Sequence, residues 1–274
     1  MIDDIMKLSD EELFSKAQGI GSGKVKIKAS PAIITGECLT KPHCNHCKWD
    51  NTKEKNEQFS LKNSVEAVIE RGQFLESVGI NRVFTASGWM GYKIPEDYPN
   101  YIEALKTNTE LEVFGLLGAI DKESLKRLKS SGMDGYLCGI ESPNEEVYRK
   151  FRPGGDTLQD RLNTLYYSKE LGLKIWSGFL VGFGEEEKDV IKGLNILKGL
   201  EPESLSILPF TPYPFTNMMG DNPANPLYWA RTVAQAHVYM KKANIFSDMQ
   251  SGFYGEYSLL TGANGSYEFP RQYK

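Results

Sequence analysis

Short apolar segments alternate with longer segments of helical periodicity along most of this chain. Eight segments are predicted to be strands: residues 25–35, 81–86, 111–120, 135–140, 173–181, 204–208, 245–248 and 266–269. Helices are predicted after them, over residues 64–78, 98–106, 121–128, 156–171, 186–200, 228–242 and 254–261. Strands that alternate with helices favour a parallel sheet. Eight of them predict a closed (β/α)8 barrel of the TIM type, with an open doubly wound sheet as the structural alternative.

The size of the chain suits one such barrel. Its 274 residues are 40% hydrophobic and 25% charged, which is ordinary for a globular α/β domain. We expect one domain over residues 1–274, with a short leading helix and a linker in residues 1–24 and the barrel in residues 25–270. Residues 19–24 are similar to a phosphate-binding loop, but Gln18 stands where its first glycine belongs and a strand follows. A linker is therefore predicted there.

Charge and hydropathy narrow the possible partners. The formal net charge is −4, so electrostatics give no reason to expect nucleic acid or an anionic membrane as a partner. Residues 1–5 are acidic and lack the basic and then apolar plan of a signal peptide. No segment approaches the roughly 18 apolar residues of a membrane span. We expect a cytoplasmic protein that binds neither nucleic acid nor membrane.

Three of the four cysteines, Cys38, Cys44 and Cys47, follow the first predicted strand within ten residues. In a reducing compartment, clustered cysteines indicate metal binding or catalysis more often than disulfides. Three thiolates are typical of an iron–sulfur cluster with one iron left open to another ligand. The local spacing is equally compatible with zinc, with His43 or His46 as the fourth ligand. The fourth cysteine, Cys138, lies in an apolar strand and is predicted to be a buried thiol.

Polar residues and glycines also follow the other predicted strands. The second strand ends at Ser87-Gly88, the fourth at Glu141-Ser142, the fifth at residues 182–185 and the sixth at residues 209–211. In a parallel barrel, functional residues lie where strands end and loops begin. The sequence therefore predicts a cofactor site at this end of the barrel.

The ordered set of these motifs resembles the radical S-adenosylmethionine (SAM) enzymes of the biotin synthase branch. It comprises the cysteine loop and Ser87-Gly88, followed by residues 136–142, 161–165, 178–185, 209–214 and 261–264, and the resemblance covers about residues 9–270. It implies that Cys38, Cys44 and Cys47 ligate a [4Fe-4S] cluster whose open iron is chelated by SAM. The reduced cluster would cleave SAM to methionine and a 5′-deoxyadenosyl radical. A small-molecule substrate and an external one-electron reductant are implied as partners.

The same resemblance assigns contacts with SAM to individual residues. His46 precedes the last cysteine, where the family usually has an aromatic residue that packs on adenine. Glu141 would hydrogen-bond the methionyl amine or the ribose, and Arg161 would pair with the carboxylate through its planar guanidinium. Four further residues would line the cofactor: Ser87 and Gly88 beside its amino group, and Gly182 and Phe183 beside its adenine.

Two departures from the family pattern bear on the substrate. Five residues, and then two, separate the three cysteines, whereas the common spacing is three and then two. The longer spacing is similar to that of the HmdB (HcgA) group, which is linked to biosynthesis of the iron-guanylylpyridinol cofactor of [Fe]-hydrogenase. Biotin synthase holds a second cluster with cysteines on later strands, but Gly115 and Trp176 stand at the matching positions here. Only Cys138 remains, so sulfur insertion is not expected.

Other functions stay open on the sequence alone. One is a different reaction on the same barrel, such as rearrangement of an amino acid or maturation of another hydrogenase. The other is a non-catalytic zinc-binding protein. For a substrate inside the barrel, the candidate lining residues are Trp89, Tyr136, Trp176 and Tyr213.

Overall fold

The computed structural model of the chain describes residues 2–20, 26–29, 31–47, 63–248, 252–263 and 265–268. All strand pairs in it are parallel. The strands are β1 (Lys26–Ala29), β2 (Ala32–Ile34), β3 (Arg82–Ala86), β4 (Glu112–Leu116), β5 (Gly135–Leu137), β6 (Lys174–Val181), β7 (Ser204–Pro209), β8 (Asn244–Asp248) and β9 (Gly265–Glu268).

The order of the strands closes the sheet into a barrel. The sheet runs β1-β9-β8-β7-β6-β5-β4-β3-β2, so β1 and β2 stand at its two ends. Only two residues separate β1 from β2, and the amide of Phe84 on β3 donates to the carbonyl of Pro31 between them. The two segments therefore act as one broken strand that pairs with β9 on one side and β3 on the other. The predicted (β/α)8 barrel is confirmed.

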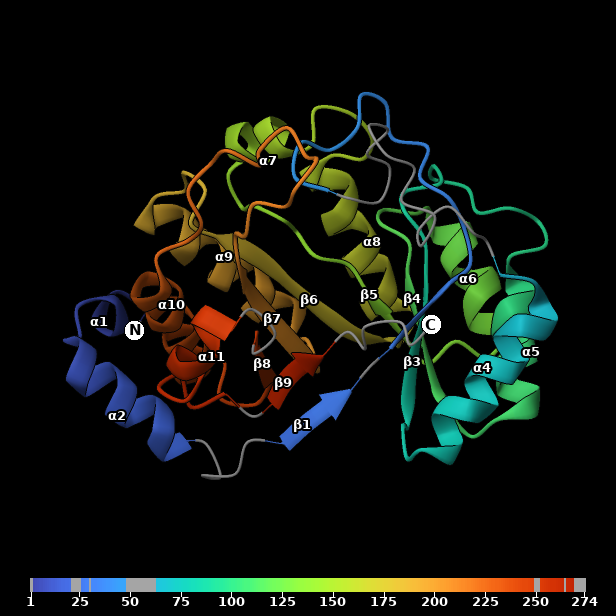
Figure 1. Cartoon of the computed structure of the whole chain (residues 1–274), viewed down its shortest axis with the longest axis horizontal. Coiled ribbons are helices and arrows are strands. Elements are labelled where there is room, and N and C mark those ends of the chain that lie inside the picture. Colours follow the sequence, from blue (N-terminus) through green and yellow to red (C-terminus); the bar gives the residue numbers. More distant parts are fainter. Residues whose placement is uncertain are drawn as a thin grey trace.

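Helices cover the outside of the barrel (Figure 1). They are α1 (Ile2–Met6), α2 (Asp10–Ile20), α4 (Val65–Ser77), α5 (Pro99–Asn108), α6 (Lys122–Ser130), α7 (Glu145–Phe151), α8 (Leu158–Glu170), α9 (Glu187–Leu200), α10 (Pro226–Tyr239) and α11 (Gly252–Ser258). Several begin at caps that can be read in the sequence. Ser64 caps α4 and Asp121 caps α6, and the side chain of each accepts a backbone N–H of the first turn.

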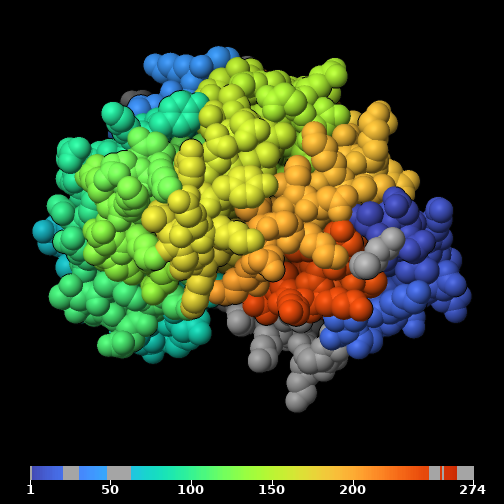
Figure 2. Space-filling view, turned by 180° about the vertical axis from the view of Figure 1, so that it is seen from behind, coloured from blue at the N-terminus to red at the C-terminus, as the bar shows by residue number. Residues whose placement is uncertain are grey.

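The N-terminal segment forms two short helices instead of the single one predicted. Both lie against the C-terminal third of the chain, as the blue and orange surfaces of Figure 2 show. Leu13 and Ala17 of α2 pack on Ala234 of α10. Arg231 of α10 donates to the carbonyl of Leu8 (2.6 Å) and so ties the turn between α1 and α2 to the barrel.

Aromatic side chains fill the half of the barrel interior that lies nearer the amino ends of the strands. The residues next to them along each strand, such as Val83 and Ile175, face outward and belong to the core between the sheet and the helices. Because side chains alternate along a strand, these aromatic residues point into the barrel. The layer consists of Phe84, Phe114, Trp176 and Phe246. Tyr136 is fully buried in the outer core, so Tyr136 and Trp176 do not line an open interior, contrary to the prediction.

Ion pairs close the barrel below this aromatic layer. Arg82 bridges Glu112 (2.6 Å) and Glu203 (2.7 Å), and its guanidinium lies 4.3 Å from the centre of the Phe114 ring. Lys174 completes the network by pairing with Glu112. Since this is the end of the barrel opposite the predicted site, we assign these charges to stability and not to catalysis.

The ion pairs predict how stability depends on pH. Partial burial raises the pKa of Glu112, but hydrogen bonds from Lys174 and Arg82 outweigh it and hold the pKa below its usual value. The resulting stabilisation is present above the ordinary glutamate pKa of about 4.3 and is lost as the pH falls through the lower pKa of the folded protein. Urea titrations from about pH 5 to about pH 3 should therefore show a shallower loss of unfolding free energy for Glu112→Gln than for wild type. Identical slopes would contradict this assignment.

The prediction of secondary structure missed one further helix. Helix α7 was not predicted, because its seven residues make only about two turns, too few for an apolar repeat to be recognised. Tyr166 lies on the outer face of the predicted helix 156–171, where it is 48% exposed. Helix α8 buries Leu158, Leu165 and Arg161 instead. The position of a charged residue in this buried set bears directly on the site.

Candidate functional site at the carboxyl end of the barrel

The cysteine loop follows β2 and crosses the carboxyl end of the barrel, where α7 and the segment after β7 also gather (Figure 1). The amide of Leu39 donates to the carbonyl of Trp89 (2.8 Å), which fastens the start of the loop to the segment after β3. A Cβ on Gly88 would lie 2.2 Å from the Cβ and 2.7 Å from the Sγ of Cys38. Only glycine at position 88 lets Cys38 approach so closely. The structure thus brings together Gly88 and Cys38, two of the predicted site residues.

The second half of the loop is held by the end of α7. The amide of Asn45 donates to the carbonyl of Phe151 (2.8 Å), and its Nδ2 donates to that of Lys150 (2.7 Å). These carbonyls lack partners within the helix, because the last turn of any helix leaves them free. The amide of Cys47 donates to the carbonyl of Cys44 (3.4 Å), so a turn joins these two cysteines. Helix α7, which was not predicted, therefore positions two of the three predicted ligands.

Two glycines beyond α7 pack against the middle of the cysteine loop. A Cβ on Gly154 would lie 2.5 Å from the carbonyl carbon of Lys41, and a Cβ on Gly155 would lie 2.9 Å from Oγ1 of Thr40. Thr40 is fully buried, and its Oγ1 has no hydrogen-bond partner among the residues that the structure describes. The contact draws residues 152–156 under the loop and places their charged side chains beside the cysteines.

Four charged side chains form a buried cluster below the loop. Arg161 donates from Nη1 to Oε1 of Glu141 (2.8 Å) and from Nε to Oδ2 of Asp156 (3.0 Å). Arg152 donates from Nη2 to Oδ1 of Asp156 (2.6 Å), and its Nη1 lies 3.8 Å from Glu141. The predicted pair Glu141 and Arg161 is thus brought together. Arg152 and Asp156 were not predicted as site residues.

The charges set the protonation states around the loop. Burial favours a neutral Asp156, but Arg161 and Arg152 outweigh it and hold the pKa of Asp156 below its usual range. Burial raises the pKa of the Cys44 thiol to about 12, against the opposing influence of nearby Arg152. Because metal coordination deprotonates a thiol, a bound iron would supply the positive charge that a Cys44 thiolate needs.

An aromatic cluster also packs against the loop. The ring of Phe151 lies 4.6 Å from that of His46, 3.9 Å from that of Phe183 and 5.6 Å from that of Phe210, measured between ring centres. Burial lowers the pKa of His46 to about 4, so its imidazole is neutral at physiological pH. Phe151 therefore joins His46 and Phe183, the residues predicted beside adenine, into one apolar wall.

The turn after β6 has its backbone donors fixed by a carboxylate. Glu185 accepts the amide of Gly182 (2.6 Å) and that of Phe183 (3.0 Å). Gly182 has a φ of 93°, and a Cβ there would lie 2.2 Å from the Cβ of Ala224. Both features require glycine. Glu185 was not predicted as a site residue, although its position three residues after Gly182 was visible in the sequence.

Ser87 forms hydrogen bonds to its own chain neighbour and to the adjacent strand β4. Its hydroxyl donates to the carbonyl of Gly88 (2.6 Å), and its amide pairs with the carbonyl of Leu116 (3.0 Å). Cys138 is 1% exposed in the barrel wall, as predicted. Its buried thiol is therefore separate from the three cysteines of the loop.

The three thiols of the loop suit an iron–sulfur cluster with one open iron. Among the described residues, no three histidine, cysteine or acidic side chains converge on one ion position. A [4Fe-4S] cluster binds each cysteine through a different iron, so its ligands are spread more widely than those of a zinc ion. His46, a candidate zinc ligand, has its ring packed on Phe151. Cys38, Cys44 and Cys47 are the residues that could hold such a cluster.

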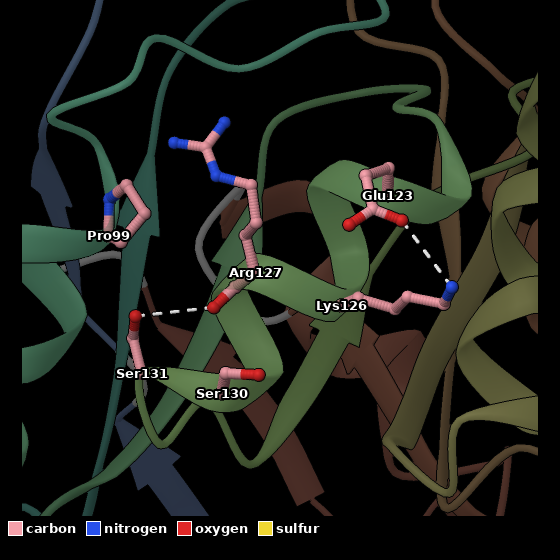
Figure 3. A pocket seen from close by; sticks show the side chains of 6 residues that line it. All are labelled: Pro99, Glu123, Lys126, Arg127, Ser130 and Ser131. Atoms are coloured by element: carbon pink, nitrogen blue, oxygen red, sulfur yellow. Dashed lines mark hydrogen bonds and ion pairs between the residues drawn. The ribbon is translucent and has the colours of Figure 1, made fainter.

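A separate surface depression of about 440 Å³ lies on the helical layer between α5 and α6 (Figure 3). It is open to solvent, and Lys126 pairs with Glu123 at 3.4 Å on one side of it. It contains none of the predicted site residues. The lining residues are Pro99, Glu123, Lys126, Arg127, Ser130 and Ser131.

Comparison with known proteins finds a matching family model and relatives that cover most of the chain. The sequence model described as "Radical SAM superfamily" matches residues 33–196, which include all three loop cysteines and the buried charge cluster. The biotin synthase of Brucella ovis is 28% identical over 291 residues, which cover 95% of this chain and 86% of that protein.

Two solved structures share the barrel. A methylornithine synthase (PylB) has a TM-score of 0.81 at 19% identity, covering all of this chain and 83% of that one. HydG, a maturase of the [FeFe]-hydrogenase, has a TM-score of 0.80 at 18% identity, covering 96% of this chain and 62% of that one. At these identities the likeness shows the common fold.

Proposed function

Because the chain belongs to the radical SAM superfamily, whose members use a [4Fe-4S] cluster and SAM, we propose that Cys38, Cys44 and Cys47 bind the cluster at the carboxyl end of the barrel. The observation that carries this proposal is the loop geometry: Gly88 packs against Cys38, helix α7 holds Asn45 between the other two cysteines, and the charges of Arg152 and Arg161 act on Cys44. When bound, the cluster supplies the electron that cleaves SAM into methionine and a 5′-deoxyadenosyl radical. The protein supplies position, charge and exclusion of water.

The side chains around the loop would bind the two ends of SAM separately. Arg161 would donate hydrogen bonds to the carboxylate of SAM, and Glu141 would accept a hydrogen bond from its amine or from a ribose hydroxyl. The apolar wall of His46, Phe151 and Phe183 would hold the adenine, with Gly182 beside it. Ser87 and Gly88 lie next to Cys38 and would face the amino group. The zinc-binding alternative is disfavoured, because the radical SAM family model covers the cysteine loop.

For the substrate, we propose a step in biosynthesis of the iron-guanylylpyridinol cofactor of [Fe]-hydrogenase. The spacing of five and then two residues between the cysteines supports it. Biotin formation is disfavoured, because Gly115 and Trp176 leave no thiols for a second cluster. The alternative is rearrangement of an amino acid, since one structural neighbour is a methylornithine synthase. Product analysis separates the two.

We expect a small-molecule substrate and an external one-electron reductant, with activity in the cytoplasm and no nucleic-acid partner. The acidic net charge of −4 supports the last expectation. Among the described residues, no helix is both long and apolar enough to cross a membrane.

The test is anaerobic reconstitution of the full chain with iron and sulfide, followed by reduction in the presence of SAM. We expect a brown, oxygen-sensitive protein that releases 5′-deoxyadenosine, quantified by chromatography. The Asp160→Asn variant serves as a control, because Asp160 caps α8 beside Tyr92 and does not contact the loop. Colourless protein that holds stoichiometric zinc and forms no deoxyadenosine would refute the proposal.

A further inference from the structure

We propose that Asp156 is a positioning residue that orients the guanidinium of Arg161 toward the carboxylate of SAM. This inference rests on the proposed function, because it concerns how the same site recognises its cofactor. Asp156 itself would not touch the cofactor. It lies beneath Arg161 and acts through it.

The hydrogen bonds of Asp156 leave no room for another role. The side chain is completely buried, and Oδ2 accepts from Nε of Arg161 (3.0 Å) and from the amide of Ala119 (2.8 Å). Oδ1 accepts from Nη2 (2.6 Å) and Nε (3.1 Å) of Arg152 and from the hydroxyl of Tyr148 (3.3 Å). Both carboxylate oxygens are thus occupied by protein donors, so Asp156 is not available to bind a ligand.

These contacts fix Arg161 in one direction. Asp156 holds the Nε edge, while Nη1 donates to the carbonyl of Gly139 (2.5 Å) and to Glu141 (2.8 Å). Among the described residues, no acceptor takes the Nη2 hydrogens of Arg161. The donors of Arg161 that remain are the two hydrogens of Nη2, and the fixed guanidinium holds them in one plane where a ligand carboxylate can accept them.

Glu141 is the member of the cluster that a ligand can reach. Its side chain is 17% exposed, whereas those of Asp156 and Arg161 are 0% and 6% exposed. Its backbone has a φ of 54°, a conformation that is uncommon for a residue with a side chain and often marks functional sites. The positive charges of the two arginines balance the negative charges of two carboxylates. Asp156 is buried and fixed, whereas Glu141 lies at the surface of the cluster. A ligand carboxylate would therefore meet Arg161 on the side of Glu141.

A merely structural role for Asp156 makes a different prediction. Asp156 also joins the loop of residues 152–156 to the chain after β4 through Ala119. If this were its only role, a substitution would weaken binding of every ligand of the site equally. If Asp156 orients Arg161, the loss would be confined to ligands that carry the carboxylate.

The experiment compares two ligands on the reconstituted full chain. Equilibrium dialysis measures the affinity of wild type and Asp156→Asn for SAM and for decarboxylated SAM, which lacks only the carboxylate. We expect Asp156→Asn to weaken SAM binding by about tenfold to a hundredfold, the usual effect of losing a residue that orients a ligand-binding group. Binding of decarboxylated SAM should change by less than about threefold. Iron content should equal that of wild type.

Two further variants sharpen the result. Asp160→Asn makes the same chemical change four residues later, at a carboxylate that accepts hydrogen bonds from Thr157 and Tyr92 and not from Arg161. It should leave the ratio of the affinity for SAM to the affinity for decarboxylated SAM unchanged. Asp156→Glu keeps the negative charge but moves it by one methylene group. It should lower the ratio of the affinity for SAM to the affinity for decarboxylated SAM. This variant carries the test if Asp156→Asn does not fold.

The outcomes separate this inference from the proposed function. Equal losses for both ligands, or failure of both Asp156 variants to fold, would assign Asp156 to the fold alone and overturn the inference. Failure of wild type to bind SAM or to take up iron would overturn the proposed function instead.

Discussion

The Cys44→Ala variant should contain almost no iron–sulfur cluster after anaerobic reconstitution and should form no 5′-deoxyadenosine above a protein-free control. Two remaining thiolates cannot replace the three that leave one iron open for SAM. No other cysteine can substitute, because Cys138 lies buried in the barrel wall. Iron and sulfide analysis together with the visible absorption of the cluster measures the first effect, and chromatography measures the second.

The matched control for this prediction is Cys138→Ala. Cys138 belongs to the hydrophobic core, and its thiol donates weakly to the carbonyl oxygens of Gly118 (3.7 Å) and Gly139 (4.0 Å). We expect this variant to bind as much iron as wild type. Loss of the cluster in Cys138→Ala together with its retention in Cys44→Ala would mean that the wrong cysteines have been assigned.

The Phe151→Ala variant should have an unfolding free energy about 3–5 kcal/mol lower than wild type, the usual cost of removing a fully buried phenylalanine. Phe151 is completely buried and lies against the rings of His46, Phe183 and Phe210. Its removal would leave a cavity between the cysteine loop and the turn after β6. Urea unfolding followed by circular dichroism measures the change.

The Phe74→Ala variant removes the same side chain from a surface position, since Phe74 on α4 is 62% exposed. Its unfolding free energy should stay within about 0.5 kcal/mol of wild type. A loss for Phe151→Ala as small as that for Phe74→Ala would show that the aromatic wall is not tightly packed. The wall would then be an unsuitable surface for adenine.

The barrel could be predicted from the sequence because its signals are local. Capping residues such as Ser64 and Asp121 mark where helices begin, and apolar runs such as residues 173–181 mark strands. Each signal depends on residues within a few positions of one another. The split of the first strand into β1 and β2 was not predicted. It follows from pairing with two different strands, β9 and β3, at the ends of the sheet.

The candidate site was predicted only in part, for the same physical reason. Cys38, Gly88 and Glu141 follow predicted strands directly, so the parallel barrel by itself places them at one end. Phe151 and Asp156 lie in and after a helix too short to show a period. Nothing near them in sequence distinguishes a buried side chain from an exposed one.

The sequence by itself determined the parallel barrel, the three-cysteine loop and the end of the barrel at which that loop lies. Only the tertiary structure decided which side chains surround the loop: Asp156 between two arginines, and Phe151 between His46 and Phe183. Periodicity and caps act over a few residues, whereas burial of a charge depends on partners from distant segments. Asp156 stays charged in the core because Ala119, 37 positions earlier, and two arginines after α7 and on α8 converge on it.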